Sequence, residues 1–248
     1  MRLPPATLTF ATVQSFIHTD NVYETEEDRR ESPGWVGLFG VSYVPYSTLH
    51  WTPRVAFQQA LVRFTKESPG DYDSQILSLL SSLDLSANQA WTWHSGFTLS
   101  RYYGRLGGGG EFYKYFSLDN SIAYRRALDA REEWHFFGAF WLSWRQTDPA
   151  RLSRIENALS LGLIYYPAPG LSIAPYVRPA LYIYPNDSSV DTDRRDFNLN
   201  AGLAVSWTPL RQLAVGTGFN WTGNYSTSER RGYEELLPGV SLTFTFGF

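Results

Sequence analysis

Apolar and polar side chains alternate with a period of two along most of this chain, and this alternation constrains the possible fold more than any other feature. Between residues 196 and 207 the odd positions carry apolar side chains, while the even positions are small or polar. The segments 153–166, 171–184 and 212–224 follow the same rule, and 239–248 alternates in the same way with its apolar residues at even positions. Successive side chains of a β-strand point to opposite faces of the sheet. The pattern therefore predicts strands with one apolar face and one polar face.

The residues on the polar face are mainly Gly, Ala, Ser, Thr and Asn, with few charges. Charged residues make up 18% of the chain, and lysine occurs only at Lys66 and Lys114. The solvent face of a β-sandwich normally carries many long charged side chains. Small, weakly charged residues instead suit the inner wall of a barrel, where side chains from many strands converge.

The alternation and its interruptions predict twelve strands. The connections between them alternate between short turns, such as 167–170 and 209–211, and longer polar loops, such as 19–34 and 185–194. This alternation is typical of outer-membrane barrels with long outer loops, and an even strand number places both termini in the periplasm. The pair Gln58–Gln59 interrupts the parity and predicts a β-bulge. The expected strands are 6–18, 35–44, 53–65, 75–86, 91–103, 111–126, 133–145, 153–166, 171–184, 195–208, 212–226 and 236–248.

Most tryptophans fall at the predicted strand ends. An amphipathic indole ring is favoured at the depth of the lipid headgroups, so this placement predicts an aromatic girdle at each membrane surface. The alternative, a sandwich core, would place them in the middle of strands. Trp141 is the exception, because its parity places it in the lumen. The predicted girdle residues are Trp35, Trp51, Trp91, Trp93, Trp134, Trp144, Trp207 and Trp221.

Composition excludes several other classes. No run of about 18 apolar residues predicts a transmembrane helix. The net charge of −3 gives no reason to expect nucleic acid as a partner. The absence of cysteine excludes disulfide scaffolds and thiolate metal sites. The N-terminus lacks an apolar signal core, so we expect a mature chain or an excised barrel domain.

A sheet that spans lipid must close on itself, because every backbone polar group has to be paired within the protein. We therefore predict an all-β fold: one domain, residues 1–248, forming a transmembrane antiparallel up-and-down β-barrel of about twelve strands in the bacterial outer membrane, with outer-membrane lipid and lipopolysaccharide as its surroundings.

The last ten residues, GVSLTFTFGF, resemble the terminal strand of bacterial outer-membrane β-barrel proteins, which alternate aromatic residues and end on phenylalanine. The resemblance implies that Phe244, Phe246 and Phe248 form the signal read by the barrel assembly machinery, and that folding depends on periplasmic chaperones. The segments 16–24 and 166–170 are also similar to barrels found in exopolysaccharide and secretion gene clusters.

Several charged residues have the parity of the lumen wall. In a narrow pore such charges would set the ion preference. Alternatively they pair across the interior and rigidify or plug it. The aromatic residues Tyr115, Tyr176, Tyr182, Tyr184 and Trp141 either form a stacking path for sugars or fill space. The predicted lumen residues are Asp84, His94, Asp119, Arg125, His135, Arg154, Glu156 and Arg178, with Arg145 near the outer rim.

Catalytic chemistry is not expected. His94 and Ser95 suggest a hydrolase, but neighbouring residues on a strand face opposite sides, so Ser95 would face lipid. A catalytic triad needs its members within hydrogen-bond reach. The acids Asp71, Asp73, Asp191 and Asp193 lie in predicted long loops without a matching histidine, and we interpret them as solvated charges or, alternatively, as weak contacts for divalent cations. No catalytic residue, cofactor or metal site is predicted.

Four functions remain open, in this order. The first is a channel, porin-like, that passes small polar solutes. The second is the membrane barrel of an export or secretion assembly, for example for polysaccharide, which would need a periplasmic export partner. The third is an outer-membrane lipid-modifying enzyme. The fourth is a blocked barrel with a structural or adhesive role.

Overall fold

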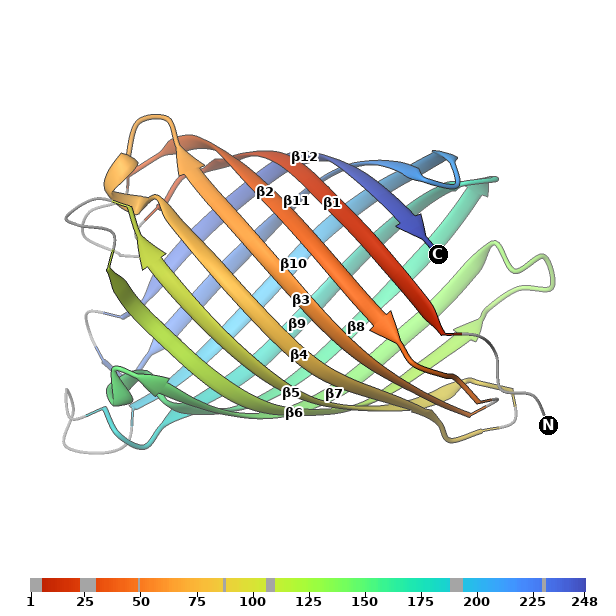
Figure 1. Cartoon of the computed structure of the whole chain (residues 1–248), viewed down its shortest axis with the longest axis horizontal. Coiled ribbons are helices and arrows are strands. Elements are labelled where there is room, and N and C mark those ends of the chain that lie inside the picture. The colour runs from red at the N-terminus through yellow and green to blue at the C-terminus, as the bar shows by residue number, and fades with distance from the viewer. Residues whose placement is uncertain are drawn as a thin grey trace.

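The computed structural model is a closed barrel of twelve antiparallel strands (Figure 1). It describes residues 6–22, 30–48, 50–86, 88–105, 110–187, 194–228 and 231–248. Each strand pairs with its neighbours in sequence, so the predicted all-β, up-and-down architecture is confirmed. The strands are β1 (Thr7–Thr19), β2 (Ser32–Val44), β3 (Trp51–Phe64), β4 (Tyr72–Asp84), β5 (Trp91–Gly104), β6 (Glu111–Ala127), β7 (Trp134–Asp148), β8 (Arg154–Ala168), β9 (Leu171–Tyr184), β10 (Arg194–Leu210), β11 (Leu213–Ser226) and β12 (Tyr233–Gly247).

The barrel closes where β1 meets β12. Their register runs from Thr9 opposite Gly247 to Ile17 opposite Gly239. Beyond it, Leu8 and Phe248 exchange two backbone hydrogen bonds of 3.0 and 2.8 Å. The start of β1 and the end of β12 lie at the same end of the barrel, as Figure 1 shows. The pairing leaves no open sheet edge, which is the condition for spanning lipid.

The apolar face of every strand points outward. Each strand presents at least one large hydrophobic side chain to the surroundings, among them Phe16 at 61% exposure and Phe140 at 51%. Buried apolar residues, by contrast, are few in the described part of the chain: Ala60, Val62, Ala158, Ala180 and Tyr184. A water-soluble protein buries its large apolar residues. The arrangement here is the reverse, which is that of a barrel surrounded by hydrocarbon.

The eight predicted girdle tryptophans all lie on the outward parity. Trp51, Trp91, Trp93, Trp134 and Trp207 are at the end with the short turns, while Trp35, Trp144 and Trp221 are toward the end with the long loops. Trp134 stacks on Tyr165 with the ring centroids 4.3 Å apart. The terminal residues Phe244, Phe246 and Phe248 also point outward and are exposed.

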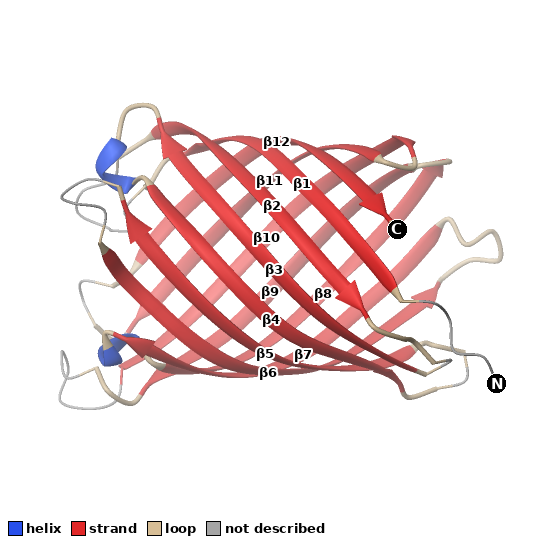
Figure 2. Cartoon of the chain, viewed as in Figure 1, coloured by secondary structure: helices blue, strands red, loops and turns tan. Residues whose placement is uncertain are grey.

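The two ends of the barrel differ in their connections. At the end opposite the termini, two 3₁₀ turns, η1 (Ser68–Gly70) and η2 (Ala150–Leu152), follow β3 and β7 (Figure 2). At the other end the turn between β8 and β9 passes through Gly170 with φ +76°, a conformation that glycine adopts without strain. Parts of the predicted long loops, including residues 23–29, 106–109 and 188–193, lie outside the described residues. No helix in the part of the chain that the structure describes is long and apolar enough to cross a membrane.

Two details of the sequence prediction are wrong. The register of β3 runs without a shift through Gln58 and Gln59 on both sides, so no bulge is present there. Gln58 faces the lumen, and Gln59 faces outward opposite Gln75 of β4. Polar residues on both faces, rather than an inserted residue, cause the break in parity. The irregular registers occur instead next to Tyr103, Ala168 and Leu210.

Asp73 is also not a loop residue, because β4 begins at Tyr72. Its carboxylate forms an ion pair with Arg63 on the outward face of β3. Asp71 does lie in the connection, where it accepts a hydrogen bond of 2.7 Å from the backbone N–H of Phe64. Asp191 and Asp193 lie outside the described residues.

Candidate functional site

The inner wall of the barrel has two unlike sectors. On β10, β11, β12 and β1 the inward residues nearest the short turns are mostly Gly, Ala, Ser and Thr, so the backbone is close to the wall surface. A cavity of about 390 Å³ follows this sector, lined in part by Ala204, Gly216, Gly218, Gly239 and Ser241. The opposite sector, on β5 to β9, carries most of the inward charged and aromatic side chains; the inward charges outside it are Arg54, Asp84, Arg194, Asp196 and Glu235. The lumen therefore retains space along the sector of small residues.

The structure places all eight predicted lumen residues on the inward parity. Their partners in register are themselves inward-facing: His94 lies opposite Ser82 and Ser121, and Glu156 lies opposite Ser143 and Tyr182. The eight residues do not form one site. They divide into a group on β7 to β9 nearer the long loops, a group around Asp119 and His94, and a group at the end with the short turns.

The group on β7 to β9 is an arginine cluster formed by Arg145, Arg154 and Arg178 around one carboxylate, Glu156. Arg145 and Arg154 are direct partners across β7 and β8. Glu156 pairs with Arg178, and its Oε2 is 3.5 Å from Nη2 of Arg154. Like charges placed directly opposite each other destabilise a sheet. Three cations and one anion give the cluster a formal net charge of +2.

Tyrosine rings support the arginines. The guanidinium of Arg145 lies 4.3 Å from the ring centroid of Tyr115, and that of Arg154 lies 4.2 Å from the centroid of Tyr182. Arg154 also donates a hydrogen bond of 3.2 Å to the hydroxyl of Tyr184. In the described part of the protein, the buried Nε atoms of both Arg145 and Arg154 have no hydrogen-bond partner. The tyrosine rings thus hold in place a cluster with an excess of positive charge.

A second, buried network lies closer to the long loops, and the sequence prediction missed it. Arg194 pairs with Asp187 and Asp196, and Asp196 also accepts hydrogen bonds from Asn224 and Ser226. Each of these charges has a partner, so the network fastens β10 to β11, although two carboxylates against one guanidinium leave it a net charge of −1. Asp196 has the parity of Asn198 and could have been assigned to the lumen, but Asp187 lies beyond the strand in a connection.

The group around Asp119 and His94 lines a cavity of about 380 Å³, to which Arg54 and Trp141 also contribute. Asp119 accepts hydrogen bonds from Ser117, at 2.8 Å, and from Ser143. The Nδ1 atom of His94 is 2.9 Å from the hydroxyl of Ser82 on the neighbouring strand. Arg54 is a lumen residue that sequence reasoning missed, because the two glutamines of β3 obscured that strand's parity.

The group around Asp119 and His94 does not have the geometry of a hydrolase. Ser95 has outward-facing partners, Ser81 and Asn120. Asp84 accepts its hydrogen bond, of 3.1 Å, from Thr92. Among the described side chains no hydrogen bond joins Asp84 to His94, so a base oriented by an acid is lacking. The described residues also contain no group of three or more potential metal ligands.

Arg125 and His135 lie at the end with the short turns. Arg125 donates a hydrogen bond of 3.0 Å to the hydroxyl of Tyr166, and Nε2 of His135 is 3.0 Å from the backbone oxygen of Glu132. The ring of His135 meets that of Tyr166 edge-on at 5.6 Å. These two residues line the rim rather than the middle of the lumen.

A closed antiparallel barrel with an apolar outer wall, girdles of tryptophan and a polar interior has the fold of bacterial outer-membrane β-barrel proteins. Solved structures of this class match nearly the whole chain. An outer membrane channel from Pseudomonas putida F1 has a TM-score of 0.65 and 13% sequence identity, covering 99% of this chain and 97% of that one. The β-domain of the Bordetella autotransporter BrkA has a TM-score of 0.55 at 12% identity, covering 97% and 100%. The NanC porin has a TM-score of 0.54 at 9% identity, covering 94% and 98%. No family model and no curated protein sequence matches.

Proposed function

We propose that this protein is a passive channel for small polar solutes, and that the arginine cluster gives it a preference for anions. The observation that carries the proposal is the division of the inner wall into a sector of small residues that leaves room and a sector that concentrates charge. A barrel of twelve strands is wider than the eight-stranded kind that its own side chains fill. The likeness to an outer membrane channel and to the NanC porin agrees with this function.

The anion preference follows from the charges that face the lumen at the cluster. Among the described residues Arg145 forms no ion pair, whereas Glu156, the one carboxylate of the cluster, is already engaged by Arg154 and Arg178. An anionic solute would therefore find donors without first breaking an ion pair. At about 4 Å in water one unit charge contributes about 1 kcal/mol. Removing one arginine should accordingly change the permeability ratio by roughly fivefold in dilute salt.

Planar bilayers test both parts of the proposal. The purified protein should give discrete conductance steps, with a reversal potential in a salt gradient that favours the anion. The double variant Arg145→Gln/Arg154→Gln should retain the steps and lose most of the selectivity, more clearly in about 0.1 M salt than in about 1 M, where screening is strong. Arg195→Gln, an outward-facing change on β10, is the matched control and should leave the selectivity unaltered.

The two parts fail separately. Absence of conductance steps from correctly folded protein would refute the channel. Steps whose selectivity is the same in the wild type and the double variant would refute the role of the arginine cluster alone.

A second candidate is the membrane barrel of an export assembly, and the likeness to the BrkA autotransporter domain favours it. On this alternative the isolated barrel should be silent in bilayers, and conductance should appear after deletion of a long connection such as residues 20–31, between β1 and β2. The channel proposal expects the full chain to conduct without such a deletion.

A further inference from the structure

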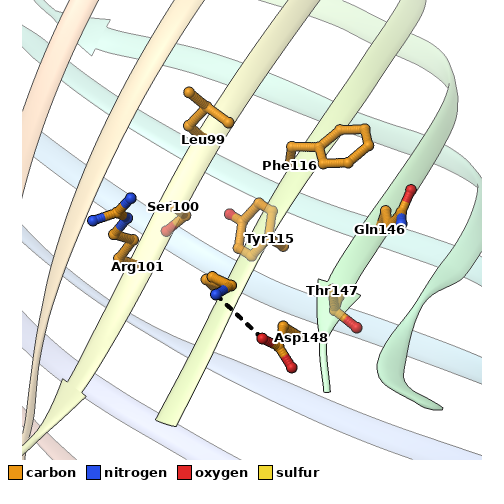
Figure 3. A pocket seen from close by; sticks show the side chains of 9 residues that line it. Leu99, Ser100, Arg101, Tyr115, Phe116, Gln146, Thr147 and Asp148 are labelled. Atoms are coloured by element: carbon orange, nitrogen blue, oxygen red, sulfur yellow. Dashed lines mark ion pairs between the residues drawn. The ribbon is translucent and has the colours of Figure 1, made fainter. Parts of the chain in front are cut away.

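A groove lies on the outer wall of the barrel, on the face opposite to the lumen. Leu99, Phe116 and Gln146 are consecutive partners in register across β5, β6 and β7, and the next outward row toward the long loops is Arg101, Lys114 and Asp148. The two rows enclose a cavity of about 300 Å³ (Figure 3). Its position, at the long-loop end of an outward face, corresponds to the depth at which lipid headgroups meet acyl chains.

The part of the groove nearer the middle of the barrel wall is apolar. Leu99 is 43% exposed on the outer wall. Phe116 packs edge-on against Trp144, with the ring centroids 5.2 Å apart, and Trp144 is itself 44% exposed. An indole next to a half-buried phenylalanine and an exposed leucine offers a surface on which an acyl chain can lie.

The part of the groove nearer the long loops is charged. Nζ of Lys114 is 3.3 Å from a carboxylate oxygen of Glu111 and 3.2 Å from one of Asp148; the latter ion pair is the dashed line that meets Asp148 in Figure 3. Nε of Arg101 is 3.7 Å from the other carboxylate oxygen of Glu111. An irregularity in the β5–β6 register between Tyr102 and Tyr103 brings Glu111 beside these cations. Bulges commonly redirect a side chain in this way.

Mutual ion pairing does not account for the position of these charges. The side chains of Arg101, Lys114 and Asp148 are 64%, 47% and 68% exposed. Exposed pairs of this kind contribute little to stability. The next strands around the barrel are largely apolar at the same depth: among the outward residues of β8, β9 and β10, all within the described ranges, Arg195 carries the only charge. The charged row of the groove thus stops at β7, and on its other side it continues into the outward ion pair of Arg63 and Asp73 on β3 and β4.

We infer that this groove binds a phosphorylated glycolipid of the membrane leaflet on the long-loop side. Its phosphate would accept hydrogen bonds from Lys114 and Arg101, and an acyl chain would lie along Leu99, Phe116 and Trp144. The sugar hydroxyls would donate to the carboxylates of Glu111 and Asp148 and to the amide oxygen of Gln146. A phosphatidylglycerol headgroup offers the phosphate with only two hydroxyl donors, so a rim that combines cations with several acceptors favours a saccharide headgroup.

Native mass spectrometry of the full chain, folded in detergent, can test the inference with diphosphoryl lipid A as the probe. One molecule should remain bound to the wild type. Charge-assisted hydrogen bonds are strong enough that the double variant Arg101→Gln/Lys114→Gln should bind about tenfold more weakly or worse. Arg195→Gln should bind like the wild type. The charge-preserving variant Lys114→Arg should retain most of the affinity, which would show that the position tolerates substitution when the charge is kept.

Lipid specificity provides an independent measurement that uses only the wild type. Lipid A from which both phosphates have been removed, and phosphatidylglycerol, should each bind much more weakly than diphosphoryl lipid A. Equal binding of the wild type and the Arg101→Gln/Lys114→Gln variant would overturn the site, and equal binding of phosphatidylglycerol would overturn the glycolipid. Neither outcome depends on whether the lumen conducts.

Discussion

Glu156→Gln should destabilise the barrel by about 2 kcal/mol. Glu156 contributes the one carboxylate of the arginine cluster, and its side chain contacts both Arg154 and Arg178. Glutamine preserves the shape and one acceptor oxygen but removes the charge, so the two arginines would face each other and the neighbouring Arg145 without compensation.

The magnitude follows from burial. Exposed ion pairs are worth about 0–1 kcal/mol, and removal of one partner from a fully buried pair costs about 3–5 kcal/mol. The Glu156 side chain is 11% exposed, and those of Arg154 and Arg178 are 21% and 29% exposed. The cluster therefore lies between the two cases, and the acceptor that glutamine retains moves the expectation toward the lower part of that interval.

Urea unfolding of the protein in lipid vesicles, followed by tryptophan fluorescence, would measure the loss. Sulfate should stabilise the Glu156→Gln variant more than the wild type, because a bound anion replaces the missing charge. Asp84→Asn is the control. Asp84 also faces the lumen, but within the described residues it accepts one hydrogen bond, from Thr92, and forms no ion pair. Its replacement should cost less than about 1 kcal/mol. Equal losses for the two variants, with no response to sulfate, would refute the reasoning.

Three further outcomes are expected. Gly170→Ala should lower the free energy of unfolding by about 1–3 kcal/mol, because φ is +76° and an added Cβ would lie 2.8 Å from a backbone oxygen; an unchanged urea midpoint would contradict this. In variants that keep a single tryptophan, brominated lipid should quench Trp144, which faces outward, and not Trp141, which faces the lumen; equal quenching would be inconsistent with the assigned faces. Deleting Phe248 removes two backbone hydrogen bonds to β1 and should lower the free energy of unfolding by about 1–3 kcal/mol. Phe248→Ala keeps these hydrogen bonds and should cost less. Equal losses in vesicle unfolding would argue against a role for the backbone pairing of β1 with β12.

The strands, and the face of the sheet to which each side chain points, were predictable because both depend on a local rule. A residue such as Phe219 or Asn220 is assigned to lipid or lumen by parity alone, and parity survives errors of one or two residues at strand ends. The same rule placed Arg145, Arg154 and Glu156 on one face of neighbouring strands. It failed in β3, where glutamines on both faces made the two parities look alike.

The contacts within the site were not predictable in the same way. Whether Glu156 meets Arg178 depends on the register between β8 and β9, and register is a property of strand pairs around the whole barrel. The Arg194 network includes Asp187, which lies outside any strand and carries no periodic signal. Glu111 reaches Arg101 and Lys114 through an irregular register that no feature of the sequence announces.

Because the charges are unevenly distributed around the inner wall, the electrostatic potential in a channel would vary across the lumen as well as along its axis. In a ring of twelve strands β8 stands opposite β2, and the inward residues of β2, all of them described, carry no charge. The positive potential of the arginine cluster therefore falls off from one side of the passage to the other. A dipolar solute in that gradient would orient its negative end toward β7–β9 and its uncharged side toward β1 and β2. The pore would then select molecules by the distribution of their charge as well as by their net charge.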